Sequence, residues 1–244
     1  PASGVAQAFS LEVAGGTTNY VQDSFATNLY TGTGTTAQTI TNGLDLATDG
    51  GMTWIKSRSN AYDHVLQNSE SGITKSLFVN TSDAEDASAP YMTSYNSNGF
   101  TVAGGGWYAT NETAFEYVSW TFKKQAKFFD IVTYTGTGVA GRTVSHNLGS
   151  IPGMIIFKKT SASDNWAVYH RGANGGTDPE DYRLELNENF PQSNRDGFLY
   201  DTAPTATEFT VGDGALSNTN GATYVAYLFG HDTAADSLIQ CGIC

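Results

Sequence analysis

The stretch Tyr30-Thr31-Gly32-Thr33-Gly34 occurs twice in this chain, the second time as Tyr134-Thr135-Gly136-Thr137-Gly138. Further matching blocks follow both copies in the same order, with small gaps between them. They pair residues 51–52 with 153–154, 77–80 with 184–187, 99–102 with 208–211, and 117–122 with 224–229. The matched positions are mostly apolar and spaced as in strands, which indicates that the repeat preserves a hydrophobic core.

The repeat has a period of about 100 residues, which exceeds the unit of a solenoid and matches the size of a domain. We therefore predict two tandem domains, at residues 24–124 and 127–232. The join between them, residues 123–127, is short and basic. So short a join favours domains stacked end to end with limited freedom.

The composition favours strands over helices. Gly is abundant, with 27 residues, and charged residues make up only 15% of the chain. No window has the apolar spacing of an amphipathic helix, whereas strand-like runs and turn signals alternate at intervals of about 8–12 residues. Residues 224–229 lack a polar alternation, which is typical of a strand with both faces buried. The predicted fold class is all-β, with two tandem antiparallel β-sandwich domains of the jelly-roll or lectin-like type.

The charge balance argues against two classes of partner. Twelve Lys and Arg residues oppose 24 Asp and Glu residues, which gives a formal net charge of −12. Nucleic-acid binding needs a basic surface, so we expect no nucleic-acid partner. No run approaches the roughly 18–20 apolar residues of a membrane span, so we expect no membrane insertion.

Both ends of the chain lie outside the repeat. Phe9, Leu11 and Val13 alternate within residues 1–23, which predicts an N-terminal extension or a docking strand. Residues 233–244 contain a segment similar to the lead-in of the second Tyr-Thr-Gly-Thr-Gly copy. We expect them to be a linker or the start of a further repeat.

No group of residues predicts catalysis or cofactor binding. Cys241 and Cys244 have the spacing of half a zinc site or of a redox pair, but an ordinary strand is favoured because the other ligands and a βαβ setting are missing. The histidines are His64, His146, His170 and His231, and the acidic clusters are Asp83, Glu85 and Asp86, then Asp178, Glu180 and Asp181. The histidines fit polar core or loop positions, and solvated loops are favoured over a calcium site or a glycosidase pair. We predict no catalytic residue, no metal site and no cofactor.

Exposed aromatic residues are the remaining candidates for binding. Several lie among Gly, Ser and Asn, where flat rings bind sugar faces or mediate protein contacts. The candidates are Trp107, Tyr108, Tyr91, Tyr95 and Tyr62. In a chain so poor in charge, contacts between subunits are favoured over a glycan pocket.

Several motifs also resemble a known family. Residues 142–149 (RTVSHNLG), 152–158 (PGMIIFK) and 165–170 (NWAVYH), with residues 51–56 (GMTWIK) and 93–102 (TSYNSNGFTV) in the first copy, carry the likeness. Together with the Tyr-Thr-Gly-Thr-Gly stretch, they resemble a repeated domain of unknown function in structural and tail-fibre proteins of marine tailed phages. The resemblance covers about residues 24–240 and implies β-sandwich, lectin-like domains in a virion, with no catalytic residues to carry over.

The leading interpretation is therefore a non-enzymatic virion structural protein, a component of a tail fibre or a comparable surface appendage. The alternative is a carbohydrate-binding module that recognises a host surface glycan, and a polymer-cleaving enzyme is a third hypothesis. Rings such as Trp54, Trp107, Tyr108 and Trp120 exceed what two small cores must hide, so some should be buried between chains. We expect a homo-oligomer, with a trimer favoured, located in the virion among other virion proteins.

Overall fold

The computed structural model describes residues 20–195, 197–234 and 237–242. The prediction of an all-β chain is confirmed, because antiparallel strands dominate the described residues and the helices among them are short. No helix among these residues is long and apolar enough to cross a membrane. Phe9, Leu11 and Val13 of the predicted docking strand, and Cys244 of the Cys-x-x-Cys motif, lie outside the described residues.

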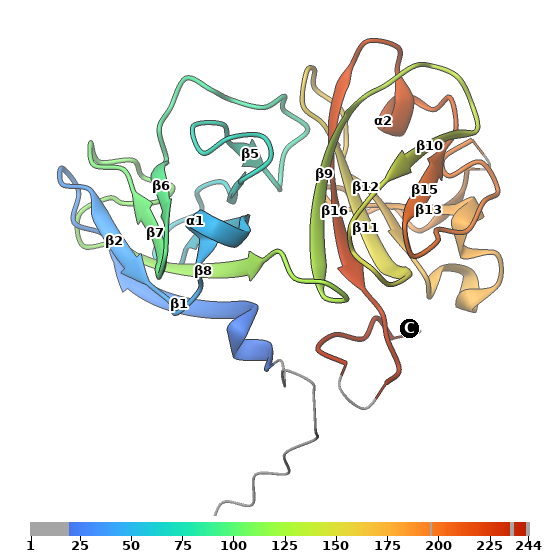
Figure 1. Cartoon of the computed structure of the whole chain (residues 1–244). Coiled ribbons are helices and arrows are strands. Elements are labelled where there is room, and N and C mark those ends of the chain that lie inside the picture. The colour runs from blue at the N-terminus through green and yellow to red at the C-terminus, as the bar shows by residue number, and fades with distance from the viewer. Residues whose placement is uncertain (1–19, 196, 235–236, 243–244) are drawn as a thin grey trace, which may run out of the picture.

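The N-terminal half, residues 20–124, contains one large and one small antiparallel sheet (Figure 1). The large sheet has the order β1-β8-β3-β4-β5, and the small sheet has the order β2-β7-β6. The elements are η1 (Val21–Asp23), β1 (Phe25–Thr31), β2 (Gln38–Thr41), α1 (Leu46–Asp49), β3 (Gly51–Ser57), β4 (Val65–Asn68), β5 (Leu77–Phe78), β6 (Met92–Asn96), β7 (Gly99–Val102) and β8 (Glu116–Lys123). Ile55, Phe100 and Tyr117 belong to the core of this half.

The C-terminal half, residues 127–232, follows the same plan. Its large sheet has the order β14-β13-β12-β11-β16-β9, and β10 pairs with β15 in a small sheet. The elements are β9 (Phe129–Thr135), β10 (Arg142–Ser145), β11 (Pro152–Lys159), β12 (Ala167–His170), η2 (Ala173–Gly176), η3 (Pro179–Asp181), β13 (Tyr182–Glu185), β14 (Ser193–Asn194), β15 (Glu208–Val211), α2 (Ala215–Asn218) and β16 (Thr223–Gly230). Phe157, Phe209 and Leu228 belong to its core.

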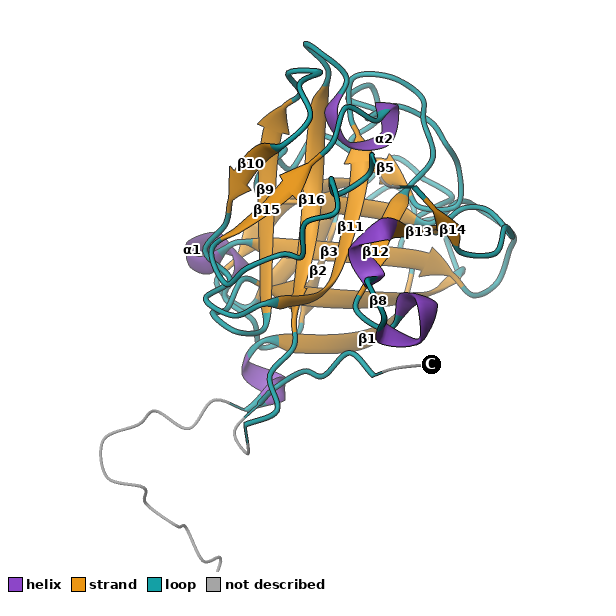
Figure 2. Ribbon diagram, turned by 90° about the vertical axis from the view of Figure 1, so that its right-hand side faces the viewer, coloured by secondary structure: helices purple, strands orange, loops and turns teal. Residues whose placement is uncertain are grey.

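A third hydrophobic core joins the two halves. The described strands pair only within their own half, but the large sheets pack face to face with their strands running crosswise (Figure 2). The buried residues of this core include Met52, Leu66, Leu77 and Val79 from the N-terminal half and Phe129, Ile131, Ile156, Trp166, Val168, Val225 and Tyr227 from the C-terminal half. The expectation of end-to-end stacking is wrong, because both large sheets carry apolar side chains on the face turned away from their small sheet.

Each half contains a pair of stacked tyrosines on two paired strands. The ring centroids of Tyr30 and Tyr117 lie 5.1 Å apart, and those of Tyr134 and Tyr224 lie 5.2 Å apart. The Tyr30 and Tyr134 hydroxyls donate to the backbone oxygens of Thr110 and Ser217, each at 2.7 Å. These tyrosines are the first residues of the two Tyr-Thr-Gly-Thr-Gly stretches, so each stretch begins with a hydrogen bond to the segment before the last strand of its half, which is a turn at Thr110 and helix α2 at Ser217.

A buried asparagine holds the rest of each motif. The Asn111 carboxamide accepts a hydrogen bond from Thr33 N (2.8 Å) and donates to the backbone oxygens of Thr36 and Ala103. The Asn218 carboxamide likewise accepts from Thr137 N (2.8 Å) and donates to the backbone oxygens of Val139 and Gly212. Glycine is needed in both stretches, because a Cβ on Gly32 or Gly136 would lie 2.1 or 2.2 Å from a facing backbone oxygen.

Candidate functional site

The predicted aromatic surface separates into two pairs of rings. Tyr62 and Tyr108 stack with centroids 5.4 Å apart, and Tyr108 is 57% exposed. Tyr91 and Trp107 lie 5.5 Å apart at a tilted angle. The structure therefore places four of the five predicted rings in two pairs, which are linked because Trp107 and Tyr108 are consecutive residues.

The fifth ring does not belong to this surface. Tyr95 packs against the core of the N-terminal half, and its hydroxyl donates to Gln67 O at 2.7 Å. Burial raises the pKa of this phenol well above its ordinary value. Tyr95 lies on β6, which packs over the large sheet, and its neighbours Ser94 and Asn96 gave the sequence segment a polar appearance.

The histidines and the cysteine have structural contacts. His64 Nδ1 accepts a hydrogen bond from Trp54 Nε1, and His146 Nδ1 accepts one from Leu148 N. Cys241 is buried, and burial raises the pKa of its thiol, which disfavours a reactive thiolate. Among the described residues, no three His, Cys, Asp or Glu side chains form a group that could hold a metal ion.

The first acidic cluster is held by local contacts. Asp83 accepts a hydrogen bond from Thr81 Oγ1, Asp86 accepts two from Ser88, and Glu85 forms an ion pair with Lys75 at 3.2 Å. In the second cluster, a hydrogen bond with Asp201 raises the pKa of Asp181 to about 6, with repulsion from neighbouring carboxylates adding to the shift.

The junction between the halves contains polar groups that the sequence did not single out. Residues 78–85 of the N-terminal half lie along the C-terminal half through several hydrogen bonds. Trp166 Nε1 donates to the backbone oxygens of Phe78 (3.2 Å) and Thr81 (3.1 Å). Glu85 N donates to Thr160 O, and Asp164 N donates to Ser82 O.

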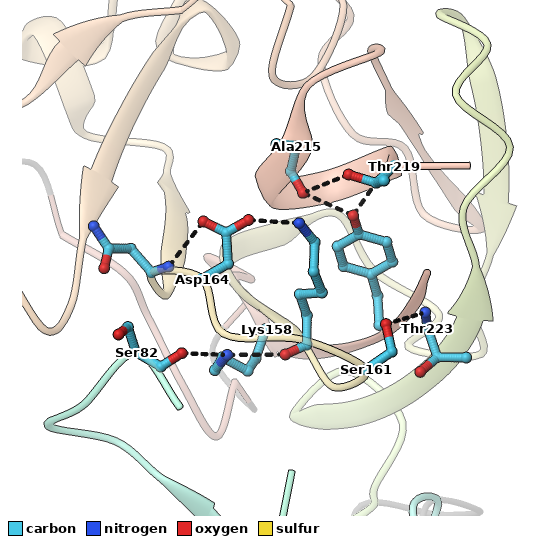
Figure 3. Close-up of polar contacts among 10 residues, drawn as sticks. Ser82, Lys158, Ser161, Asp164, Ala215, Thr219 and Thr223 are labelled. Carbon is cyan, nitrogen blue, oxygen red and sulfur yellow. Dashed lines mark hydrogen bonds and ion pairs between the residues drawn. The ribbon is translucent and has the colours of Figure 1, made fainter. Parts of the chain in front are cut away.

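Lys158 is fully buried at this junction. Its Nζ donates to the backbone oxygens of Ser82 (3.3 Å) and Lys159 (2.8 Å), as Figure 3 shows. Desolvation lowers the pKa of this amine to about 8, and the neighbouring Asp164 opposes the shift only in part. The Asp164 carboxylate is itself paired with Lys159 Nζ at 2.6 Å, so Lys158 has no direct carboxylate partner among the described residues.

A polar groove of about 280 Å³ opens between the two halves. The N-terminal half lines it with Glu70, Ser71, Lys75 and Glu85, and the C-terminal half lines it with Thr133, Tyr134, Thr135, Thr160, Thr223 and Tyr224. The sequence did not predict this groove. Its threonines are typical of exposed strand positions, and its charged residues are typical of surface loops.

A second hollow lies on the C-terminal half alone. It has a volume of about 520 Å³ and is mostly apolar. Its walls include Val168, His170, Leu184, Leu186 and Gln192. All its lining residues belong to the C-terminal half, and its apolar walls form a surface suited to apolar contacts.

The residues that the structure describes thus form an all-β protein with four antiparallel sheets. The chain belongs to a family that is described as a domain of unknown function, DUF7483, whose model matches residues 21–234. One family model thus spans both halves and the core between them. No curated protein and no solved structure matches the chain.

Proposed function

We propose that the chain is a non-enzymatic structural protein of a virion, a component of a tail fibre or a comparable surface appendage. The observation that carries the proposal is the hydrophobic core between the halves, which includes Trp166, Tyr227 and Met52. A large apolar interface makes two domains behave as one rigid body. A rigid body of this kind suits a spacer that holds other surfaces at fixed positions.

The architecture in this proposal is two tandem β-sandwich domains of the jelly-roll or lectin-like type, related by duplication. The matched tyrosine pairs and the matched asparagines support it, because each contact recurs at the equivalent place in both halves. The resemblance to marine phage structural proteins supports a virion location, and it rests on sequence motifs alone.

Partners in this proposal are other virion proteins and further copies of the chain, with a trimer favoured. Large apolar side chains on the surface support such contacts. Leu29 and Val139 are each 64% exposed, Phe190 is 61% exposed and Ile151 is 56% exposed. Association would remove these side chains from water.

The test is to locate the chain and to measure its mass. Mass spectrometry of purified particles should detect the protein, and cryo-electron microscopy should place its four-sheet body in an appendage. Light scattering on the isolated chain should give a multiple of 26.0 kDa. Absence from particles and presence only in infected cytoplasm would contradict the structural role.

A second candidate function is recognition of a host surface glycan. The stacked pair of Tyr62 and the exposed Tyr108 favours it, because aromatic faces pack against sugar rings. A glycan array should show binding that Tyr108→Ala removes. Tyr200→Ala, which removes a half-exposed tyrosine from the C-terminal half, is the matched control and should leave the binding intact.

A further inference from the structure

The polar groove between the halves has a row of hydroxyl groups along one wall. Thr135 of β9 pairs with Thr223 of β16, and Thr160 Oγ1 lies 2.6 Å from Thr223 Oγ1. Thr133 lies two residues before Thr135 on the same strand, so its side chain lies on the same face. Hydroxyl groups from β9, from β16 and from Thr160, which directly follows β11, therefore line the groove, and each can donate or accept a hydrogen bond.

The opposite wall carries carboxylates that already have cationic partners. Glu70 pairs with Lys124 at 2.8 Å, and Glu85 pairs with Lys75 at 3.2 Å. Each groove carboxylate thus has a lysine partner, although Lys124 is shared with Asp130 at 3.4 Å. A free cation would have to displace a lysine from each carboxylate, and an anion would meet two carboxylates, so a neutral polar ligand fits best.

Glu85 has an acceptor that the protein leaves unused. Its side chain is 10% exposed, and its Oε1 is buried with no hydrogen-bond partner among the described residues. A buried carboxylate oxygen without a donor raises the free energy of the folded state. Glu85 and its partner Lys75 both line the groove, and Lys75 is 46% exposed, so a ligand there can contact both side chains.

We propose that this groove binds a neutral polyhydroxylated ligand, namely one sugar unit of a glycan. Sugar hydroxyls donate to the Glu85 and Glu70 carboxylates and accept from Lys75 and the threonines of the facing wall. The volume of about 280 Å³ is near the lower end of the roughly 300–1,000 Å³ range of small-molecule pockets and suits one such unit. Because residues of both halves contact it, the ligand holds the halves together and neither half forms the site alone.

The site is distinct from the aromatic pair of the second candidate function. Saturation-transfer NMR with the methyl glycosides of glucose, galactose, mannose and N-acetylglucosamine tests it on the full chain. At about 10 mM glycoside, a dissociation constant of about 1 mM gives nearly full occupancy. We expect transfer to at least one glycoside. Glu85→Gln should weaken binding about tenfold or more, and Thr135→Val about threefold.

Control variants show whether a loss of glycoside binding is specific to the groove. Thr143→Val makes the same change at an exposed position of β10, outside the groove, and should leave binding unchanged. Thr135 is exposed and its hydroxyl has no protein partner among the described residues, so Thr135→Val carries the test if Glu85→Gln fails to fold. Tyr108→Ala should also leave this binding unchanged.

Three results would overturn the proposal. One is the absence of transfer to every glycoside, and another is equal binding by the wild-type chain and both groove variants. The third is loss of binding in Tyr108→Ala with binding intact in the groove variants, which would move sugar recognition to the aromatic pair. Tight binding of calcium chloride, with the same variant sensitivity and no glycoside binding, would instead identify a cation site.

Discussion

The two halves of the chain share one arrangement of strands but differ in the side chains of their interiors. Tyr30 pairs with Tyr117 in the N-terminal half as Tyr134 pairs with Tyr224 in the C-terminal half, and the registers of the central strands agree. The equivalent inward positions, read from these registers, are Thr53 and Ile155, Gln67 and Tyr169, Ser119 and Ala226, and Thr121 and Leu228. The N-terminal half is therefore polar where the C-terminal half is apolar.

This difference weakens the N-terminal half on its own. The hydroxyls of Thr53, Ser119 and Thr121 are buried and have no hydrogen-bond partner among the described residues. Burial of an unpaired hydroxyl costs about 1–3 kcal/mol. We infer that the N-terminal half draws more of its stability from the shared core than the C-terminal half does.

The two halves also contribute unequally to the hydrophobic core between them. Position 166 holds a fully buried tryptophan, whereas the equivalent position 64 holds a half-buried histidine. The Trp166 indole donates to two backbone oxygens of the N-terminal half. The C-terminal half thus supplies the larger side chain, and the N-terminal half supplies the loop that covers it.

Removal of that side chain should have the largest effect. Trp166→Ala deletes a buried ring and its hydrogen bonds, so we expect the free energy of unfolding to fall by about 3–5 kcal/mol. Urea denaturation followed by tryptophan fluorescence and circular dichroism measures it. His64→Ala, at the equivalent position, should cost about 1 kcal/mol because it removes one hydrogen bond. Equal losses in the two variants would contradict the unequal roles of the halves.

The buried Lys158 should make stability depend on pH. Its pKa is about 8 in the folded chain and about 10.4 in the unfolded chain, so the unfolded chain binds more protons between these values. The free energy of unfolding should therefore rise with pH through this window, by up to about 3 kcal/mol. Above about pH 10 the trend should reverse, because burial raises the pKa of Tyr134 and Tyr227 and only the unfolded chain ionises them.

A pair of lysine variants isolates this effect. Lys158→Met should abolish the rise above about pH 8. Lys56→Met, at the equivalent place in the N-terminal half, should retain it, because Lys56 is only half-buried. Urea denaturation at a series of pH values gives the curves. A wild-type curve that stays flat from about pH 8 to 10 would show that Lys158 is solvated or paired in solution.

Sequence patterns predicted the strands better than they predicted the packing between sheets. Alternation and turn signals were enough for an all-β assignment, since they report each strand's own faces. The apolar run at residues 224–229 also indicated that both faces of β16 are buried. The run did not indicate that the large sheet of the N-terminal half covers the second face, because any apolar surface could cover it.

The candidate sites were less predictable for a similar reason. Tyr95 and Tyr108 both lie in sequence stretches rich in Gly, Ser or Asn, yet only Tyr108 is exposed, because Tyr95 packs against the core between β6 and the large sheet. Lys158 matches Lys56 in sequence and in its hydrogen bond to the next residue's backbone oxygen, but Lys158 also contacts Ser82 of the other half and is buried. Burial that results from contacts between segments distant in sequence cannot be predicted from the local sequence pattern.

The asparagines of the two motifs should contribute equally. Asn111→Ala and Asn218→Ala each remove a carboxamide that pairs buried backbone groups, so each should lower the free energy of unfolding by about 1–3 kcal/mol. Asn220→Ala, which changes an exposed residue beside the same loop, is the control and should have an effect within about 0.5 kcal/mol of zero. A loss confined to one asparagine would break the equivalence of the two halves.

The smallest expected effect tests the polar interior directly, by exchanging one oxygen atom between equivalent positions. Ser119 and Ala226 are both fully buried on the last strand of their large sheets in sequence order. Ser119→Ala removes a buried hydroxyl without a partner and should stabilise the chain by about 1 kcal/mol, whereas Ala226→Ser adds one and should destabilise it by at least as much. If urea denaturation gives changes of opposite sign in the free energy of unfolding for the two variants, the unpaired hydroxyls of the N-terminal interior destabilise the chain. Destabilisation by Ser119→Ala would mean that ordered water satisfies this hydroxyl, and the two interiors would then differ in hydration and not in stability.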